Sequence, residues 1–232
     1  MRGKFIVFEG IDGSGKSTRA KIAFEYLKNL GVNVVFLTEP AKGFLGERIR
    51  EIVTSLENPV SLLAQVFLFS ANRAHFYETV IKPKLEEGIW IVMDRSWIST
   101  IAYQGYGEGY GDPALLDQID LITKMATKGI DFDLCILCDI SVEAALTRIS
   151  NRGAKTDYFE SKRIDFAKRM RQGYLESIKR YPNLKFFVLG TERNADGNVV
   201  IMEDEIKNIL KLYLGGGLVL WKYCRIKGRM RF

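Results

Sequence analysis

Glycines, a lysine and a hydroxyl residue near the start of the chain have the spacing of a phosphate-binding loop. The string Gly10-Ile11-Asp12-Gly13-Ser14-Gly15-Lys16-Ser17, followed by Thr18, matches G-x-x-x-x-G-K-[ST] in full. Glycines let backbone N–H groups turn toward phosphate oxygens, and the N-terminus of a following helix adds partial positive charge. Lys16 would neutralise the outer phosphates and Ser17 would ligate Mg²⁺. We therefore predict a nucleoside triphosphate site here.

A second charged pair follows an apolar run at residues 89–93. Asp94 and Arg95 end this run, where P-loop proteins commonly hold a carboxylate near Mg²⁺. Arg95 would then lie beside the same phosphates. The alternative is a salt bridge or a helix cap at the end of a strand. No Asn-Lys-x-Asp guanine signature occurs, which disfavours a GTPase switch protein.

Phe69 and Arg73 are four positions apart on a predicted helix and so share a face. An aromatic ring can stack on a base while a guanidinium forms paired hydrogen bonds. The alternative is core packing for the ring and a surface position for the charge. His75, the only histidine, receives no catalytic role, because phosphoryl transfer depends mainly on positioning and charge neutralisation.

Three cations, Arg148, Arg152 and Lys155, lie on and just after another predicted helix, in front of a glycine-containing loop. Basic residues at a helix C-terminus can simply complement the helix dipole. Beside a phosphate-binding loop, a cationic lid that closes over the transferred phosphoryl group is the better interpretation. We expect this lid at about residues 148–160.

Strand-length apolar runs alternate with helical patterns along the chain. We expect strands at 4–9, 33–37, 89–93, 133–139 and 185–189, and helices at 17–30, 62–87 with a boundary near Pro83, 165–181 and 203–214. Segments 104–113 and 150–157 read as loops. Strands that are apolar on both faces and separated by helices predict α/β architecture: a doubly wound, five-stranded parallel sheet with helices on both faces. We expect one domain over residues 1–214.

Cysteines and charge limit the partners. Cys135 and Cys138 fall three apart on one expected strand, so they point to opposite faces and cannot share a metal ion. Three cysteines without a disulfide framework indicate a reduced, cytoplasmic location. The net charge is +6, and most of it lies in the tail 215–232, which has five basic residues and no acidic one. No apolar run is long enough to span a membrane.

Three strings together resemble the thymidylate kinase family over about residues 4–210. They are residues 8–18, residues 69–73, and residues 94–105, which approach the family pattern D-R-Y-x-x-S-x-x-A-Y-Q-G. The resemblance implies ATP-dependent phosphorylation of dTMP with Mg²⁺, no covalent intermediate, small nucleotides as partners, and a homodimer. No membrane or nucleic-acid partner is expected for the kinase, and the role of the tail stays open.

The resemblance also implies roles for individual residues. Phe69 would stack on thymine while Arg73 and Gln104 bind its edge. Tyr103 would pack under the deoxyribose, and Asp12 would receive the 3′-hydroxyl. Arg95 would hold the acceptor phosphate, and the matching positions Glu39 and Ser99 join this acceptor site. The phosphate loop holds no arginine, so Arg152, with Arg148 in support, would neutralise the transferred phosphoryl group.

The chain departs from the family pattern after its second strand. The family has T-R-E-P-G, whereas this chain has Thr38 where the arginine stands, followed by Glu39 and Pro40. Either Lys42 substitutes for the missing cation, or acceptor binding is altered. A kinase for another pyrimidine nucleotide or a deoxynucleoside, and a nucleotide-binding protein with weak turnover, therefore remain alternatives.

Overall fold

The structure, a computed structural model, describes residues 1–151, 158–159, 164–190 and 203–215. Its centre is a five-stranded sheet in the order β2-β3-β1-β4-β5. All neighbouring strands pair in parallel, with Phe5 opposite Ile91 and Ile6 opposite Leu134. The strands are β1 (Phe5–Glu9), β2 (Val34–Thr38), β3 (Trp90–Asp94), β4 (Leu134–Asp139) and β5 (Phe186–Gly190). The predicted fold class is confirmed.

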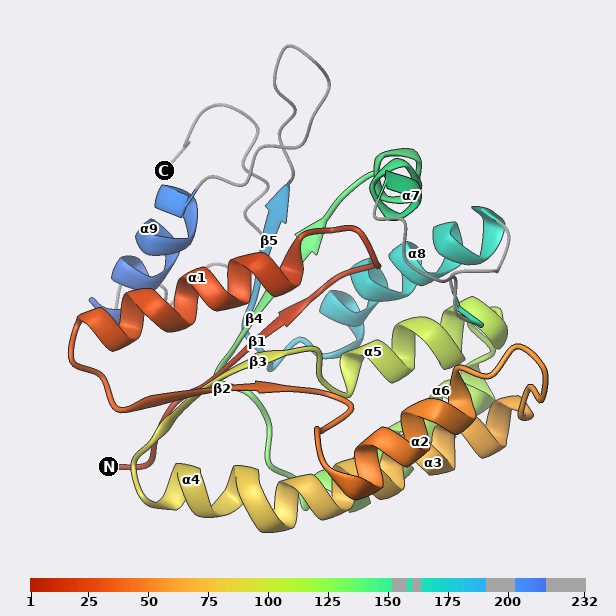
Figure 1. The fold of residues 1–232 in the computed structure, drawn as a ribbon, viewed down its shortest axis with the longest axis horizontal. Helices are drawn as coiled ribbons and strands as arrows, with labels where there is room; N and C mark the ends of the chain where they lie inside the picture. The colour runs from red at the N-terminus through yellow and green to blue at the C-terminus, as the bar shows by residue number, and fades with distance from the viewer. Residues whose placement is uncertain (152–157, 160–163, 191–202, 216–232) are drawn as a thin grey trace.

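Helices cover both faces of this sheet (Figure 1). On one face, α1 and α9 pack over Ile6 and Phe8. On the other face, α3, α6 and α8 lie over Phe5 and Val7. The helical segments are α1 (Lys16–Asn29), α2 (Phe44–Val53), α3 (Leu62–Phe76), η1 (Tyr77–Ile81), α4 (Lys82–Glu86), α5 (Ile98–Thr100), η2 (Ile101–Glu108), α6 (Pro113–Thr127), α7 (Val142–Asn151), α8 (Ile164–Arg180) and α9 (Glu203–Leu214).

The two cysteines of β4 behave as their spacing predicts. Cys135 packs in the core cluster on one face of the sheet, and Cys138 packs in the cluster on the other. Both are buried and free. They act as small apolar side chains on opposite faces, which confirms that they cannot hold one metal ion together.

The glycine-rich segment 104–113, expected to be a loop, is helical over most of its length. The wide helical turns of η2 continue to Glu108, and α6 begins at Pro113. A Cβ on Gly105 would lie 2.6 Å from the Leu116 side chain, and one on Gly107 would lie 2.6 Å from Phe166. The loop prediction was wrong for residues 104–108, because Gly105 and Gly107 serve close packing of η2 against α6 and α8, and it holds for the turn at 109–112.

The long helical pattern at 62–87 also differs in detail from expectation. The chain stays helical through Pro83, and the wide turns of η1 precede it instead of a break. Proline has no N–H to donate to the preceding turn. The change of helix type next to Pro83 therefore replaces the expected boundary.

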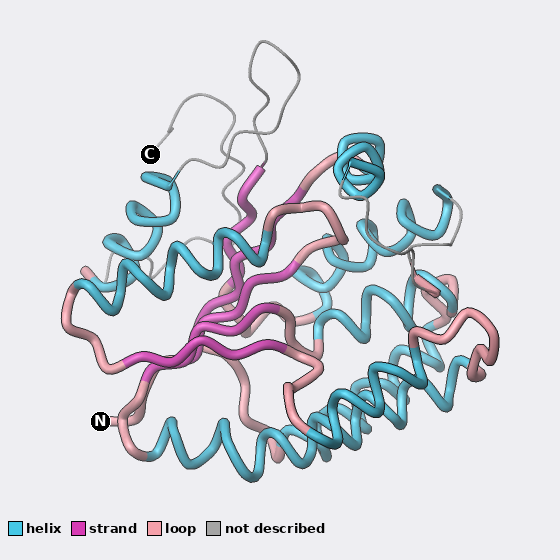
Figure 2. The backbone as a smooth tube through the Cα atoms, in the orientation of Figure 1, coloured by secondary structure: helices cyan, strands magenta, loops and turns pink. Residues whose placement is uncertain are grey.

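The central strands end at one edge of the sheet, in loops that connect them to helices (Figure 2). β1 leads into the phosphate-binding loop, β2 into Glu39 and β3 into Arg95. Ligands bind at this edge in open parallel sheets. In the part of the chain that the structure describes, no helix is long and apolar enough to cross a membrane.

Candidate active site

The loop between β1 and α1 makes close contacts that only glycine permits. Gly10 has φ 142°, and a Cβ there would lie 2.5 Å from the Cys138 carbonyl oxygen. Gly13 has φ 79°, and its Cβ would lie 2.6 Å from the Ala145 carbonyl oxygen. Arg19, fully buried below the loop, donates to the Ser14 carbonyl oxygen at 2.8 Å. The loop is thus held against β4 and α7, with Lys16 starting the helix.

Lys16 is buried among groups of both charges. Its ammonium lies 3.4 Å from Asp12 Oδ1 and 3.5 Å from the Ile11 carbonyl oxygen. Burial and the Arg95 charge lower the pKa of Lys16, and the Asp12 and Asp94 carboxylates oppose this effect. The ammonium group therefore lies beside the phosphate-binding loop, where phosphate oxygens would replace Asp12 and the Ile11 carbonyl oxygen as its partners.

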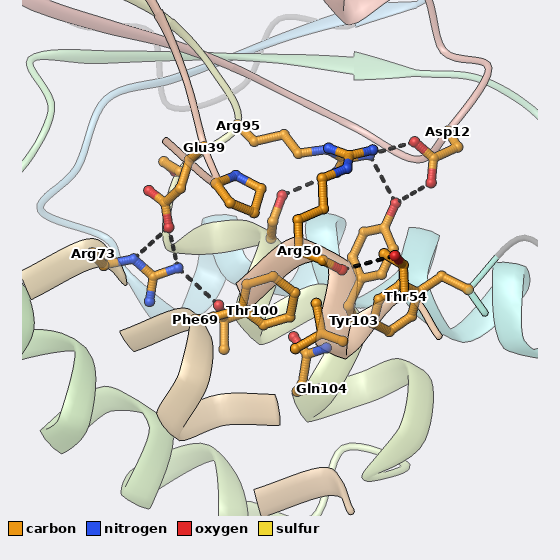
Figure 3. Close-up of a pocket in the computed structure, with 15 residues that line it drawn as sticks. Asp12, Glu39, Arg50, Thr54, Phe69, Arg73, Arg95, Thr100, Tyr103 and Gln104 are labelled. Carbon is orange, nitrogen blue, oxygen red and sulfur yellow. Dashed lines mark hydrogen bonds and ion pairs between the residues drawn. The ribbon is translucent and has the colours of Figure 1, made fainter. Parts of the chain in front are cut away.

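A pocket of about 180 Å³ opens beside this loop (Figure 3). It is lined by all eight residues predicted for acceptor binding. These are Asp12, Glu39, Phe69, Arg73, Arg95, Ser99, Tyr103 and Gln104. The structure thus brings together side chains from six separate segments, and their individual roles stay predictions.

One end of the pocket is built around Asp12 and Arg95. Arg95 Nη2 binds Asp12 Oδ1 in an ion pair, and Tyr103 donates to Asp12 Oδ2 at 2.6 Å. Arg95 also donates to Tyr103 Oη at 2.9 Å and to Ser99 Oγ at 3.1 Å. Burial alone would raise the pKa of Asp12, but the charges of Arg95 and Lys16 outweigh it and hold the pKa well below its usual range.

Glu9 supports this end from below, and the sequence analysis assigned it no role. Its buried carboxylate accepts hydrogen bonds from the Ser96 N–H at 2.6 Å and from Ser99 Oγ at 2.8 Å. Burial raises the pKa of Glu9, and Arg95 and the serine donors oppose this. Arg95 itself has φ 72°, an uncommon backbone conformation for a non-glycine residue. Glu9 therefore anchors the turn that carries Arg95.

The other end of the pocket is built around Arg73. Arg73 Nε donates to Glu39 Oε1 at 2.7 Å, and its Nη2 donates to Thr100 Oγ1 at 2.9 Å. Both ions are almost fully buried, and Glu39 Oε2 and Arg73 Nη1 have no partner among the residues that the structure describes. Phe69 lies one helical turn before Arg73 on α3 and lines the same cavity. An acceptor and a donor are thus available beside an aromatic ring.

The pocket also contains a cation that the sequence analysis missed. Arg50, on α2, lines the cavity, and its guanidinium has no hydrogen-bond partner among the described residues. Lys42 is exposed and does not line the cavity. The apolar spacing of Leu45, Ile49 and Val53 was the available signal for α2. Arg50, and not Lys42, is therefore the cation that this region brings to the site.

An aromatic residue from the predicted lid closes the cavity. Phe159 is buried, lines the pocket, and contacts Tyr103 edge-to-face with ring centroids 5.4 Å apart. Arg148 donates to the Gly13 carbonyl oxygen at 2.9 Å, which places it beside the phosphate-binding loop. Arg152 lies outside the described residues.

The two residues predicted to hold Mg²⁺ were Ser17 and Asp94. Ser17 is exposed at the first turn of α1. Asp94 ends β3, and its Oδ1 is a buried atom with no partner. Asp94 also acts electrostatically on Lys16. An unpartnered carboxylate oxygen and a free hydroxyl near this lysine are hard oxygen ligands that fit Mg²⁺.

A parallel sheet with a phosphate-binding loop after its central strand, and a second pocket beside that loop, defines the class of the protein. It is a P-loop kinase of the nucleoside monophosphate kinase type. The sequence profile named thymidylate kinase matches residues 8–199. The chain belongs to the thymidylate kinase family.

Curated relatives agree with this assignment. A thymidylate kinase from Caldanaerobacter subterraneus subsp. tengcongensis is 35% identical over 94% of this chain and 100% of its own length. One from Nostoc punctiforme is 38% identical over 93% of this chain and 99% of its own. One from Pelotomaculum thermopropionicum is 40% identical over 78% and 83%. The resemblance inferred from the three motifs is confirmed.

Proposed function

We propose that this chain transfers the γ-phosphoryl group of ATP to the phosphate of dTMP, giving dTDP and ADP. The observation that carries the proposal is the shared position of Asp12 and Lys16. They belong to the phosphate-binding loop, and Asp12 also lines the pocket that holds Phe69 and Arg73. A donor on the loop and a monophosphate in the pocket would therefore meet at this point.

In the proposed reaction, an oxygen of the acceptor phosphate attacks the γ-phosphorus in line. Lys16 neutralises charge on the donor phosphates, and Arg95 and Arg50 bind the acceptor phosphate. Arg148, beside Gly13, and Arg152 complete the neutralisation of the transferred group. Phosphoryl transfer is promoted mainly by such positioning and charge, so no covalent intermediate on the enzyme is proposed.

Ser17 and Asp94 would hold Mg²⁺, which would supply positive charge that offsets the charge of the donor phosphates. The unpartnered Asp94 Oδ1 supports this part of the proposal. The fold leaves this oxygen without a hydrogen-bond partner among the described residues. Asp94 is the last residue of β3 and pairs with Thr38 of β2, so its position is fixed by the hydrogen bonds of the sheet.

The base and sugar assignments follow from the cavity. Phe69 would stack on thymine, and Arg73 Nη1 would donate to a ring carbonyl. Tyr103, held by Asp12 and Arg95, would occupy the space that a 2′-hydroxyl needs. Asp12 would accept a hydrogen bond from the 3′-hydroxyl, in addition to those it accepts from Tyr103 and Lys16.

A coupled assay of ADP release across dTMP, dUMP, UMP, CMP and AMP tests the proposal. We expect the highest kcat/KM with dTMP. Turnover that favours AMP would contradict the assignment, and so would the absence of turnover with every monophosphate. A parallel measurement of dTDP by chromatography distinguishes transfer from ATP hydrolysis.

We also propose a homodimer, formed through the outer faces of α3 and α6 in a cytoplasmic protein. These helices pack together, and their outer faces expose Leu63, Phe67, Leu121 and Met125, the last two at 62% and 71%. Exposed apolar patches of this kind mark interaction sites. Light scattering would show a dimer that Phe67→Glu dissociates, with Leu212→Glu on α9 as the control. A monomeric wild type would contradict the proposal.

A further inference from the structure

The side-chain amide of Gln104 has one fixed orientation at the pocket. It lies in η2, is 1% exposed, and lines the cavity. Its Nε2 donates to Gln65 Oε1 at 3.0 Å. No described residue donates to Gln104 Oε1. Figure 3 draws Gln104 at the same end of the pocket as Phe69.

The neighbours of Gln65 determine which way round both amides lie. Gln65 Nε2 lies 3.1 Å from the Val60 carbonyl oxygen and 3.3 Å from Glu108 Oε1. A carbonyl oxygen and a carboxylate only accept hydrogen bonds, so the Gln65 atom that faces them must be nitrogen. Its oxygen must then face Gln104. Gln104 in turn must offer its nitrogen to Gln65, and its oxygen is left for the cavity.

Reversing the Gln104 amide would be costly at this buried position. Two oxygens would then face each other at about 3 Å, and the fully buried Gln65 Oε1 would lose its donor. A buried polar group without a partner costs about 1–3 kcal/mol. The orientation is therefore set from outside the pocket, by Val60 and Glu108 through Gln65.

We propose that Gln65, oriented by Glu108, is a positioning residue that makes the pocket select pyrimidines with a hydrogen at N3. This inference rests on the proposed dTMP kinase function. Gln104 Oε1 accepts a hydrogen bond from the N3–H of thymine or uracil. Cytosine has an unprotonated N3, so its lone pair would face the lone pairs of Oε1. The network thus excludes cytosine nucleotides by a fixed acceptor.

The test compares kcat/KM for dTMP with that for 5-methyl-dCMP, because these substrates share the methyl group and differ at N3 and position 4. Gln65→Met keeps the length of the side chain but removes the oxygen that Gln104 Nε2 needs. Gln104 can then rotate and donate to N3 of cytosine. We expect the ratio of dTMP to 5-methyl-dCMP to fall about tenfold or more.

A single conservative variant provides the matched control. In Glu108→Gln, the amide oxygen at position 108 can still accept from Gln65 Nε2, and the Val60 carbonyl oxygen is unchanged. The orientation of Gln65 and Gln104 is preserved, and we expect a ratio close to that of the wild type. Arg73, which acts at position 4 of the base, is unchanged in every variant and contributes equally.

An equal loss of kcat/KM for both substrates in Gln65→Met would overturn the inference, because a structural role predicts that result. Loss of discrimination in Glu108→Gln would also overturn it. If Gln65→Met fails to fold, Gln65→Asn, which withdraws the oxygen by one methylene, takes its place with the same expected fall. A wild type that phosphorylates neither dTMP nor dUMP would instead contradict the proposed function itself.

Discussion

The two ends of the acceptor pocket are built on different principles. At the Asp12 end, one carboxylate serves Arg95, Tyr103 and Lys16, so the cations compete for a shared partner. At the Arg73 end, Arg73 pairs with Glu39 and Gln104 pairs with Gln65, and single atoms such as Arg73 Nη1 are left without a partner among the described residues.

The two ends therefore give one pocket separate means of binding charge and of recognising shape. At the Asp12 end, an incoming phosphate can replace Asp12 as the partner of positive groups, and Arg50 stands free to join it. At the Arg73 end, buried pairs keep donors and acceptors fixed before any ligand arrives. Changes at the first end should therefore affect binding and turnover of phosphates, and changes at the second should affect the choice of base.

The largest effect is expected at Lys16. Lys16→Ala removes the ammonium that offsets phosphate charge, and we expect kcat to fall by about 10²–10³-fold. Single-turnover measurement of dTDP formation checks this. Lys21→Ala, on the same helix but exposed, is the control and should keep wild-type turnover. Undiminished kcat in Lys16→Ala would show that this end does not act through fixed charge.

Arg50 comes next, and it is compared with Lys42. Arg50→Ala removes a cation that lines the cavity, so KM for dTMP should rise about tenfold to hundredfold, as for loss of a hydrogen bond to a charged group. Lys42→Ala should leave KM within about twofold. Initial-rate kinetics at saturating ATP measure both. A larger effect at Lys42 would reverse the assignment of the cation that compensates for Thr38.

Phe69 tests the Arg73 end. Phe69→Ala removes the ring proposed to stack on thymine, and stacking on an aromatic side chain is worth about 1–3 kcal/mol per base. We expect KM for dTMP to rise about tenfold with little change in kcat. Phe44→Ala, an exposed phenylalanine on α2 (83%), is the matched control. Equal effects of the two substitutions would argue against stacking.

The smallest effect concerns stability and pH. The pKa of Asp12 is lower in the folded protein than its ordinary value of 3.8, so its ionised form stabilises the fold above that pH. This contribution is lost as the pH falls below 3.8 toward the folded-state pKa. Asp12→Asn should reduce the free energy of unfolding by about 1 kcal/mol at pH 7.

Urea unfolding of both proteins from pH 7 to pH 3 measures this difference. The difference between the two unfolding free energies should stay constant down to about pH 4 and begin to shrink at the acid end of the series. A difference that stays constant with pH would mean that the Asp12 carboxylate is not stabilised by Arg95 and Lys16.

Much of the fold could be predicted because its signals are local. Apolar runs gave the strands, and the alternation of side chains placed Cys135 and Cys138 on opposite faces. The phosphate-binding loop needs fixed residue types at fixed spacing, so its pattern is readable directly. The helical conformation of η2 could not be predicted from its glycines. Gly105 and Gly107 allow close contact with Leu116 and Phe166, which lie on other helices.

Site residues that belong to sequence motifs could be predicted, and those that reach the site only through packing of the fold could not. The motif strings named Phe69, Arg73 and Arg95, and the structure gathers them in one pocket. Arg50 was missed because Lys42, which is close to Thr38 in the sequence, was the only residue considered as a replacement for the missing cation. The contact of Gln65 with Glu108 joins residues 43 positions apart, and no local pattern marks it.

A crystal structure with dTMP and a non-hydrolysable ATP analogue would show directly how the two nucleotides lie in the site. We expect thymine against Phe69, the phosphate of dTMP between Arg50 and Arg95, and the triphosphate on the loop at Lys16. A monophosphate bound in the reverse direction, with its base toward Asp12, would contradict the proposed placement of base and phosphate.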